Sequence, residues 1–250
     1  MVLATRGRMN TGSTLNHLGM FEEAQTILER ALVDARARKI RIMEAFTLHN
    51  LGMTYARLGN LDDGIDYQRQ AARIADDTSV ARLRIQARVY ETVFLVWRGA
   101  PGDLGAALNM AKYVCDETRN HPALQIVANM ALARVQLARR AIEPALEAAR
   151  DANQRLAAGP IEEWEEFIRL TLIEALLASG NYDEADAVLD VAFRALIERA
   201  REIRKSEQRD AFLHRNEEVR RLLDLARERL GRSLPQFPDK TPSSPPPQRP

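Results

Sequence analysis

The sequence predicts an all-α fold, a right-handed solenoid of about five stacked helical hairpins that ends in a C-terminal capping helix. One observation is a bulky residue that recurs at separations of 40, 43, 38 and 40 residues: Phe21, Leu61, Leu104, Ile142 and Tyr182. Small side chains also follow at fixed distances. Three positions later stand Ala24, Gly64, Ala107, Ala145 and Ala185, and ten positions later stand Ala31, Ala71, Val114, Ala152 and Ala192. Because one hairpin cannot bury its apolar face alone, such copies are expected to stack.

A third observation is the residue two positions before each bulky residue. This column holds Gly19, Gly59, Gly102, Arg140 and Gly180, so that only Arg140 interrupts the glycines. Glycine supplies the backbone freedom that a short turn between helices needs. In the second hairpin, Gly64 leaves room for the paired helix to cross at close range, and Ala71 lies on the same face two turns later.

Residues 48–72 carry the pattern most completely, as a helix that ends near Arg57, a tight turn, and a helix that begins near Leu61. This segment resembles a tetratricopeptide repeat at its bulky, small and turn positions, which are Leu51, Gly52, Tyr55, Gly59, Leu61, Gly64 and Ala71. The period exceeds the 34 residues usual for that repeat, and about six extra residues would lengthen the helices by about 9 Å in total. Over about residues 5–230, the chain is similar to the long-period arrays of bacterial signalling proteins.

The predicted repeat domain covers residues 1–230, and residues 231–250 are expected to be a disordered, proline-rich tail. The expected units are about 5–38, 41–77, 80–118, 121–157 and 160–200, with a cap at 207–230. No capping helix precedes the first hairpin. The chain is therefore expected to be a fragment of a longer protein, or else to use its first helix as a docking edge.

The third unit is the most irregular of the five. Its first helix is apolar nearly all round, and the longer linker at 98–105 replaces the tight turn. The glycines of this linker match neither a dinucleotide-binding nor a phosphate-binding loop, because their spacing differs and no Gly-Lys pair follows. Tyr90, Phe94 and Trp97 are predicted to be core residues, with a ligand pocket as the alternative.

In the fifth unit, an acidic run falls at the expected start of the first helix, where negative charge favours the helix dipole. It consists of Glu162, Glu163, Glu165 and Glu166. A solvated helix start is the interpretation that we prefer. A pair of catalytic carboxylates is the alternative, but no positioned partner is visible in the sequence.

The last amphipathic helix is expected at about Glu217–Leu230, where it would cover the exposed edge of the final repeat. The segment AFLHRNEEVRRLLDLARERL resembles the end of repeat arrays attached to bacterial serine/threonine kinases and signal-transduction ATPases. That family often shows Val-Pro-Glu before this helix, whereas this chain has Asn216-Glu217-Glu218.

The composition disfavours several classes of function. Lysine and arginine total 36 against 35 aspartates and glutamates, which leaves a net charge of +1 and argues against nucleic-acid binding. No apolar run approaches the length of a membrane helix, so no membrane partner is expected. The single cysteine, Cys115, suits a reducing compartment, and we expect a cytoplasmic protein.

No motif for catalysis or metal binding appears in the sequence. The four histidines lie in different units or in the cap, and none has a metal-ligand spacing with another. A nucleophile elbow and kinase signatures are also missing. We therefore expect no enzyme activity, no cofactor and no metal.

The remaining candidate site is the concave surface that the first helix of each hairpin would line. By analogy with the repeat family, the inward positions are Asn16, His17, His49, Met53, Arg57, Met130 and Arg134. Arginine can bind a carboxylate through two hydrogen bonds, and methionine adapts to varied apolar side chains. The alternative is that each is an ordinary solvated or packed helix residue.

Together these observations predict a non-catalytic scaffold that binds a peptide or protein segment in its concave groove, in bacterial signalling. The alternative function is a C-terminal regulatory or sensor domain of a larger serine/threonine kinase or ATPase transcriptional regulator. Under either hypothesis the partner is a protein, and a kinase or ATPase domain in the same chain or another is the expected example.

Overall fold

The computed structural model describes residues 2–159 and 164–237, and every regular element within them is a helix. The predicted all-α class is confirmed. The helices are α1 (Val2–His17), α2 (Phe21–Ala37), α3 (Arg41–Arg57), α4 (Leu61–Asp77), α5 (Ala81–Arg98), α6 (Asp103–Glu117), α7 (Pro122–Ala138), α8 (Ile142–Ala158), α9 (Glu165–Ala178), α10 (Tyr182–Glu202), α11 (Ser206–Arg215) and α12 (Glu217–Leu230).

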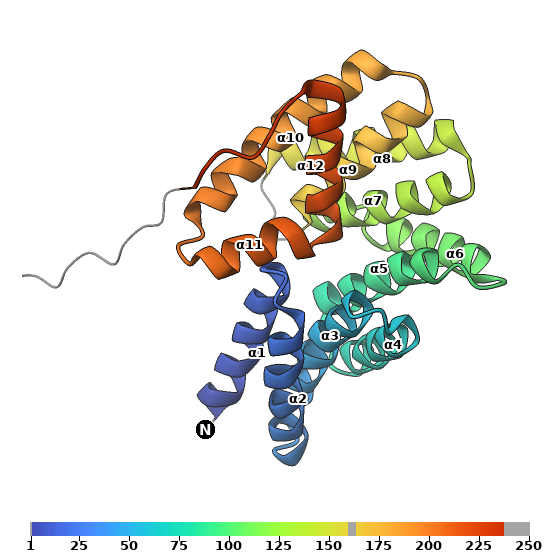
Figure 1. Cartoon of the computed structure of the whole chain (residues 1–250). Coiled ribbons are helices and arrows are strands. Elements are labelled where there is room, and N and C mark those ends of the chain that lie inside the picture. The colour runs from blue at the N-terminus through green and yellow to red at the C-terminus, as the bar shows by residue number, and fades with distance from the viewer. Residues whose placement is uncertain (1, 160–163, 238–250) are drawn as a thin grey trace, which may run out of the picture.

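The first ten helices form five hairpins that stack side by side into a solenoid (Figure 1). Each helix packs against the next one in the chain. The first helices of the hairpins, α1, α3, α5, α7 and α9, also contact one another in series and form the inner layer. This arrangement confirms the predicted α-solenoid and places Arg57 and Arg134 on inner-layer helices.

The long period arises from long helices joined by short turns. Helices α2, α3 and α4 have 17 residues each, and residues 38–40, 58–60 and 78–80 connect successive helices. The turn residues adopt a left-handed backbone, with φ of +76° at Gly19 and +90° at Gly59. Arg140, which interrupts the glycine column, has φ of +60° and so adopts the same backbone region without glycine's freedom.

The columns of small residues lie in the contacts between helices. Ala24, Ala107, Ala145 and Ala185 are fully buried, as are Ala31, Ala71 and Val114 in the second column. A Cβ atom at Gly64 would lie 3.0 Å from both the Gly52 carbonyl oxygen and the Ala56 Cβ atom. The helices therefore approach at a distance that larger side chains would not allow.

The end of the chain differs from the expected single capping helix. Two helices, α11 and α12, follow the last hairpin, and α12 packs on α9 and α10. Its apolar residues Leu222, Leu225 and Ala226 join one hydrophobic cluster with Leu170 and Phe193. In Figure 1, α11 then extends toward the upper ends of α1 and α2. The C-terminal pair thus spans from the last hairpin to the first.

The packed chain also continues past the expected tail boundary at residue 231. Leu234 and Phe237 pack against apolar residues of the C-terminal helices, and the guanidinium carbon of Arg209 lies 5.0 Å from the Phe237 ring centroid. The proline-rich composition predicted that these residues would be unstructured. Apolar contacts and a cation–π contact hold them in place instead. The rest of the predicted tail, like Glu162 and Glu163, lies outside the described residues.

Two glycines of α1 allow the packing of the first hairpin to be tested. A Cβ atom at Gly12 would lie 2.4 Å from Cγ of the fully buried Leu28, whereas one at Gly7 would meet nothing within 4 Å. We expect Gly12→Ala to lower the free energy of unfolding by about 1–3 kcal/mol through overpacking. The matched variant Gly7→Ala should raise it by up to about 1 kcal/mol through helix propensity. Urea denaturation measures both, and equal stability of the two variants would contradict the close α1–α2 contact.

Candidate protein-interaction groove

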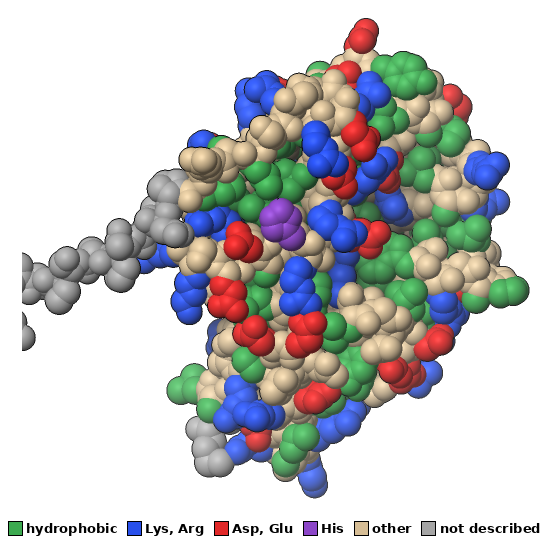
Figure 2. All heavy atoms as spheres, in the orientation of Figure 1, with side chains coloured by type: hydrophobic (Ala, Val, Ile, Leu, Met, Phe, Trp, Pro, Cys, Tyr) green, Lys and Arg blue, Asp and Glu red, His purple; other side chains and the backbone are tan. Residues whose placement is uncertain are grey.

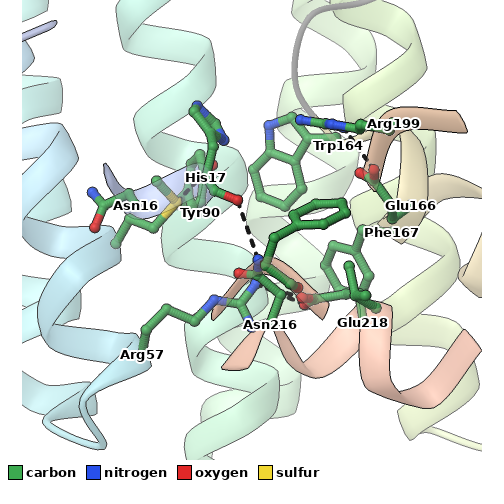
Figure 3. A pocket seen from close by; sticks show the side chains of 13 residues that line it. Asn16, His17, Arg57, Tyr90, Trp164, Glu166, Phe167, Arg199, Asn216 and Glu218 are labelled. Carbon is green, nitrogen blue, oxygen red and sulfur yellow. Dashed lines mark hydrogen bonds and ion pairs between the residues drawn. The ribbon is translucent and has the colours of Figure 1, made fainter. Parts of the chain in front are cut away.

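The start of α12 lies against the inner face of the solenoid, and Figure 3 shows the side chains that line the pocket between them. A cavity of about 70 Å³ remains between the inner helices and the C-terminal pair. Since one water molecule needs roughly 10–15 Å³ of such space, it has room for a few water molecules only. Its lining residues are Asn16, His17, Met53, Arg57, Tyr90, Trp164, Glu166, Phe167, Arg199, Phe212, Asn216, Glu218 and Val219.

A largely buried ion pair joins α3 to α12 in this region. Nη2 of Arg57 donates to both carboxylate oxygens of Glu218, at 2.8 Å each. The two side chains are only 14% and 9% exposed, so both charges are largely removed from water. Burial alone would lower the pKa of Arg57, but the negative charge and hydrogen bonds of Glu218 outweigh burial and hold that pKa above its ordinary value.

Local structure places both partners at helix ends that suit their charges. Arg57 is in the last turn of α3, where the helix dipole favours a cation. Glu217 and Glu218 are in the first turn of α12, where it favours an anion. The ion pair therefore joins a C-terminal helix end to an N-terminal one, and both dipoles reinforce it.

Aromatic rings form the floor beneath this ion pair. Trp164 lies 4.1 Å from Tyr90 and 5.7 Å from Phe167 between ring centroids, and Phe167 lies 6.3 Å from Trp97. The guanidinium carbon of Arg57 is 4.7 Å from the Trp97 ring centroid. An aromatic face attracts a cation that is held above it, so the ring holds the arginine in place.

A second arginine repeats this arrangement two inner helices further along, on α7. The guanidinium carbon of Arg134 lies 5.0 Å from the Phe167 ring centroid, and its Nη1 pairs with Glu174. A second, larger cavity of about 280 Å³ opens beside it, between the inner helices and α12. Its lining residues are Trp97, Arg134, Phe167, Leu170, Glu174, Glu217, Glu218, Arg220, Arg221 and Asp224. The groove is thus partly open along α12.

Three further contacts join the C-terminal pair to the first hairpin. Nη2 of Arg215 binds both carboxylate oxygens of Glu22, at 2.6 and 2.7 Å. Nδ2 of Asn216 donates to the His17 carbonyl oxygen at 3.1 Å, drawn as a dashed line in Figure 3. A Cβ atom at Gly19 would lie 2.7 Å from the Ala211 carbonyl oxygen. We call these contacts, together with the Arg57–Glu218 pair, the closure.

The structure brings five of the seven predicted groove residues to the two cavities. Asn16, His17, Met53 and Arg57 line the smaller cavity, and Arg134 lines the larger one.

The other two, His49 and Met130, line neither of these cavities. His49 lies beneath the groove, where its Nδ1 is 2.9 Å from Gln68 Oε1 and its ring meets the edge of Tyr90. Met130 is fully buried in the core.

Several groove residues were not expected from the sequence. Trp164, Phe167 and Glu218 come from elements that lie far from α3 in the chain. Phe94 is fully buried and Tyr90 nearly so, as the core prediction for the aromatic cluster implied, and Trp97 packs against the same core cluster. Tyr90 also lines the smaller cavity and Trp97 the larger one. The one available signal for Glu218 was the acidic pair at the start of an amphipathic helix.

Metal binding, thiol reactivity and membrane spanning can each be assessed over the described residues. No three histidine, cysteine, aspartate or glutamate side chains there are grouped to hold a metal ion. Burial, with the nearby charges of Asp116 and Asp151, raises the pKa of the Cys115 thiol to about 12, which leaves it protonated and unreactive at neutral pH. None of the described helices is long and apolar enough to cross a membrane.

Comparison with known families agrees with the geometry. A family model described as tetratricopeptide repeat matches residues 5–77, which cover the first two hairpins. A second model with the same description matches residues 168–190, in α9 and α10. These matches support a tetratricopeptide-repeat domain. A comparison with curated proteins produced no match.

The buried ion pair can be tested through stability. Glu218→Gln leaves the Arg57 guanidinium buried without a counter-charge, so we expect the free energy of unfolding to fall by about 1.5–3 kcal/mol. The control Glu198→Gln removes a carboxylate that is 68% exposed and pairs with Arg201 on the surface. That control should change stability by less than about 1 kcal/mol. Equal losses in urea denaturation would show that the Glu218 pair is no stronger than a surface one.

The approach of α11 to the first turn can be tested with two turn glycines. Gly19→Ala and Gly59→Ala both place alanine at a positive φ, and only the first would meet a neighbouring atom within 4 Å. We expect both variants to lose stability, and Gly19→Ala to lose about 1–3 kcal/mol more because α11 must shift. Amide exchange in α11 should increase in Gly19→Ala alone. The α11 contact would be contradicted if the two variants were equally stable.

Proposed function

We propose that this protein is a non-catalytic scaffold that binds a segment of a partner protein on the inner face of its solenoid. Tetratricopeptide repeats generally mediate protein–protein interaction, which is the coarse function that the family matches support. The observation that carries the finer proposal is the pair of arginines, Arg57 and Arg134, held over aromatic rings in the groove. Guanidinium groups in such a position favour carboxylates of a peptide or helix.

The proposed binding residues remain Asn16, His17, His49, Met53, Arg57, Met130 and Arg134, with two kinds of role. His17, Met53, Arg57 and Arg134 line the cavities and would contact the partner. Asn16, His49 and Met130 would hold the inner helices in register. Asn16 does so by donating to the Asn50 carbonyl oxygen at 3.0 Å and accepting from Thr54 at 2.8 Å.

The balance of charge supports a protein partner over a nucleic acid. Basic and acidic side chains are mixed over the face formed by α11 and α12 (Figure 2), and the net charge is +1. Phosphate binding needs a concentrated basic surface. We accordingly propose a cytoplasmic, protein-directed role in bacterial signalling.

A second candidate function is a regulatory or sensor domain of a serine/threonine kinase or ATPase transcriptional regulator. The observation that favours it is the closure. When a domain's own C-terminal helices cover its binding face, uncovering that face can regulate an attached or separate partner domain. A kinase or ATPase domain, in the same chain or another, would then be the regulated partner. An upstream kinase or ATPase domain in the same reading frame would support this function, and an independent promoter would favour the free scaffold.

Affinity capture with the full chain tests the proposed function. Partners identified by mass spectrometry should be lost from Arg57→Ala/Arg134→Ala, with at least a tenfold fall in recovered partner while helicity by circular dichroism is kept. The matched control Arg150→Ala/Arg194→Ala removes two arginines from α8 and α10, which are second helices of their hairpins. This control should retain every partner. If the groove variant retains every partner as well, the inner face is not the binding site.

A further inference from the structure

The start of α12 occupies the groove in the way that a bound partner would. It presents Glu217 and Glu218 from the first turn of a helix to an arginine that is stacked on an aromatic ring. The same side of the helix, one and two turns further on, packs on the last hairpin through Leu222 and Leu225. The first turn of α12 thus fills the binding surface, and its following turns hold the helix on the solenoid end.

The closure differs in character from the rest of the packing. It consists of two ion pairs, Arg57–Glu218 and Arg215–Glu22, one hydrogen bond from Asn216 to the His17 carbonyl, and the close packing of Ala211 beside Gly19. Ala211 is the one apolar side chain among these contacts. Two of these side chains, Arg215 and Glu22, are 41% and 62% exposed, so their pair is screened by water and salt. An exposed ion pair such as Arg215–Glu22 separates more readily than the buried apolar side chains that hold α12 on α9 and α10.

Glu218 of α12 leaves some hydrogen-bond donors of the two groove arginines without a partner. Both oxygens of Glu218 bind the same atom of Arg57, Nη2, while Nη1 is buried with no hydrogen-bond partner among the described residues. Nε of Arg134 is buried and unpartnered in the same part of the chain. A carboxylate that engages a guanidinium through two parallel hydrogen bonds binds more strongly than one that uses a single nitrogen. A better-placed acidic ligand would therefore gain contacts that α12 does not make.

Resting on the proposed function, we infer that the closure is displaceable and that the groove takes an amphipathic helix beginning with adjacent acidic residues. One carboxylate of the partner's acidic pair would replace Glu218 on Arg57, above Trp97, and the other would take the place of Glu217 at the larger cavity. A further acidic residue would reach Arg134. The protein's own α12 competes for the same surface, so the closed form is the resting state. Binding of the partner separates the first hairpins from the C-terminal pair.

Two full-chain variants that break the same ion pair separate opening from binding. Glu218→Arg places two cations together and opens the closure while it keeps Arg57 for a ligand. Arg57→Glu opens the closure equally but removes the ligand's contact.

The probe is a fluorescent peptide with the sequence of residues 214–230, HRNEEVRRLLDLARERL. The control peptide carries glutamine in place of both adjacent glutamates. The double variant Arg57→Glu/Glu218→Arg restores opposite charges and should close again.

We expect amide exchange in α11 to rise in both single variants and return toward wild type in the double variant. Glu218→Arg should bind the peptide of residues 214–230 at least tenfold more tightly than the wild-type chain, whose own α12 competes at high effective concentration. Arg57→Glu should show no binding above that of the control peptide.

Three results would overturn the inference: no change of exchange in either single variant, equal binding by both, or equal binding of the two peptides. If these occur while captured partners still depend on Arg57 and Arg134, the proposed function stands and only the displaceable closure fails. If captured partners are also insensitive to those arginines, the proposed function fails too.

Discussion

A buried ion pair joins parts of this chain that lie 161 residues apart, from Arg57 at the end of α3 to Glu218 at the start of α12. A solenoid of stacked hairpins has contacts mainly between neighbours, so it has no intrinsic reason to bring its two ends together. Here the closure does so, and the shape of the groove depends on it. Desolvation makes a buried ion pair a weak source of net stability, because apolar residues of similar volume often stabilise as well. A role in holding one arrangement that another ligand can replace accounts for its presence better.

The geometry that makes this pair possible is set by small residues elsewhere. Columns such as Ala24, Ala107 and Ala185 are fully buried and allow the helices to pack closely. Longer helices, 17 residues in α3 and α4, widen the inner layer. The two cavities lie between these inner helices and the C-terminal pair, and α11 and α12 reach from the last hairpin to the first (Figure 1).

Much of the fold was predictable, because the helices and turns follow from patterns of residues close together in the sequence. The small-residue columns and turn glycines report contacts within one hairpin or between neighbours, and these contacts recur with the repeat. The closure was not predictable in this way. Glu218 reads as an ordinary acidic residue at a helix start, and nothing in its neighbourhood indicates Arg57 as its partner. Met130 was placed on the inner face by analogy, yet lies in the core, since the repeat pattern fixes a helix face only to within a neighbouring position. Trp97, predicted as core within an aromatic cluster, packs against the core and also lines the larger cavity, so both of its predicted environments are present.

The central claim, that the C-terminal pair covers the inner face through a displaceable polar closure, is tested most directly by a distance between the two ends. Spin labels on Asn10→Cys in α1 and Glu228→Cys in α12, in a Cys115→Ser background, report that distance by pulsed electron spin resonance. The account predicts one narrow distribution in the otherwise unchanged chain, and a broader, longer one when Glu218→Arg is added. A broad distribution in both proteins, or the same narrow one in both, would contradict it.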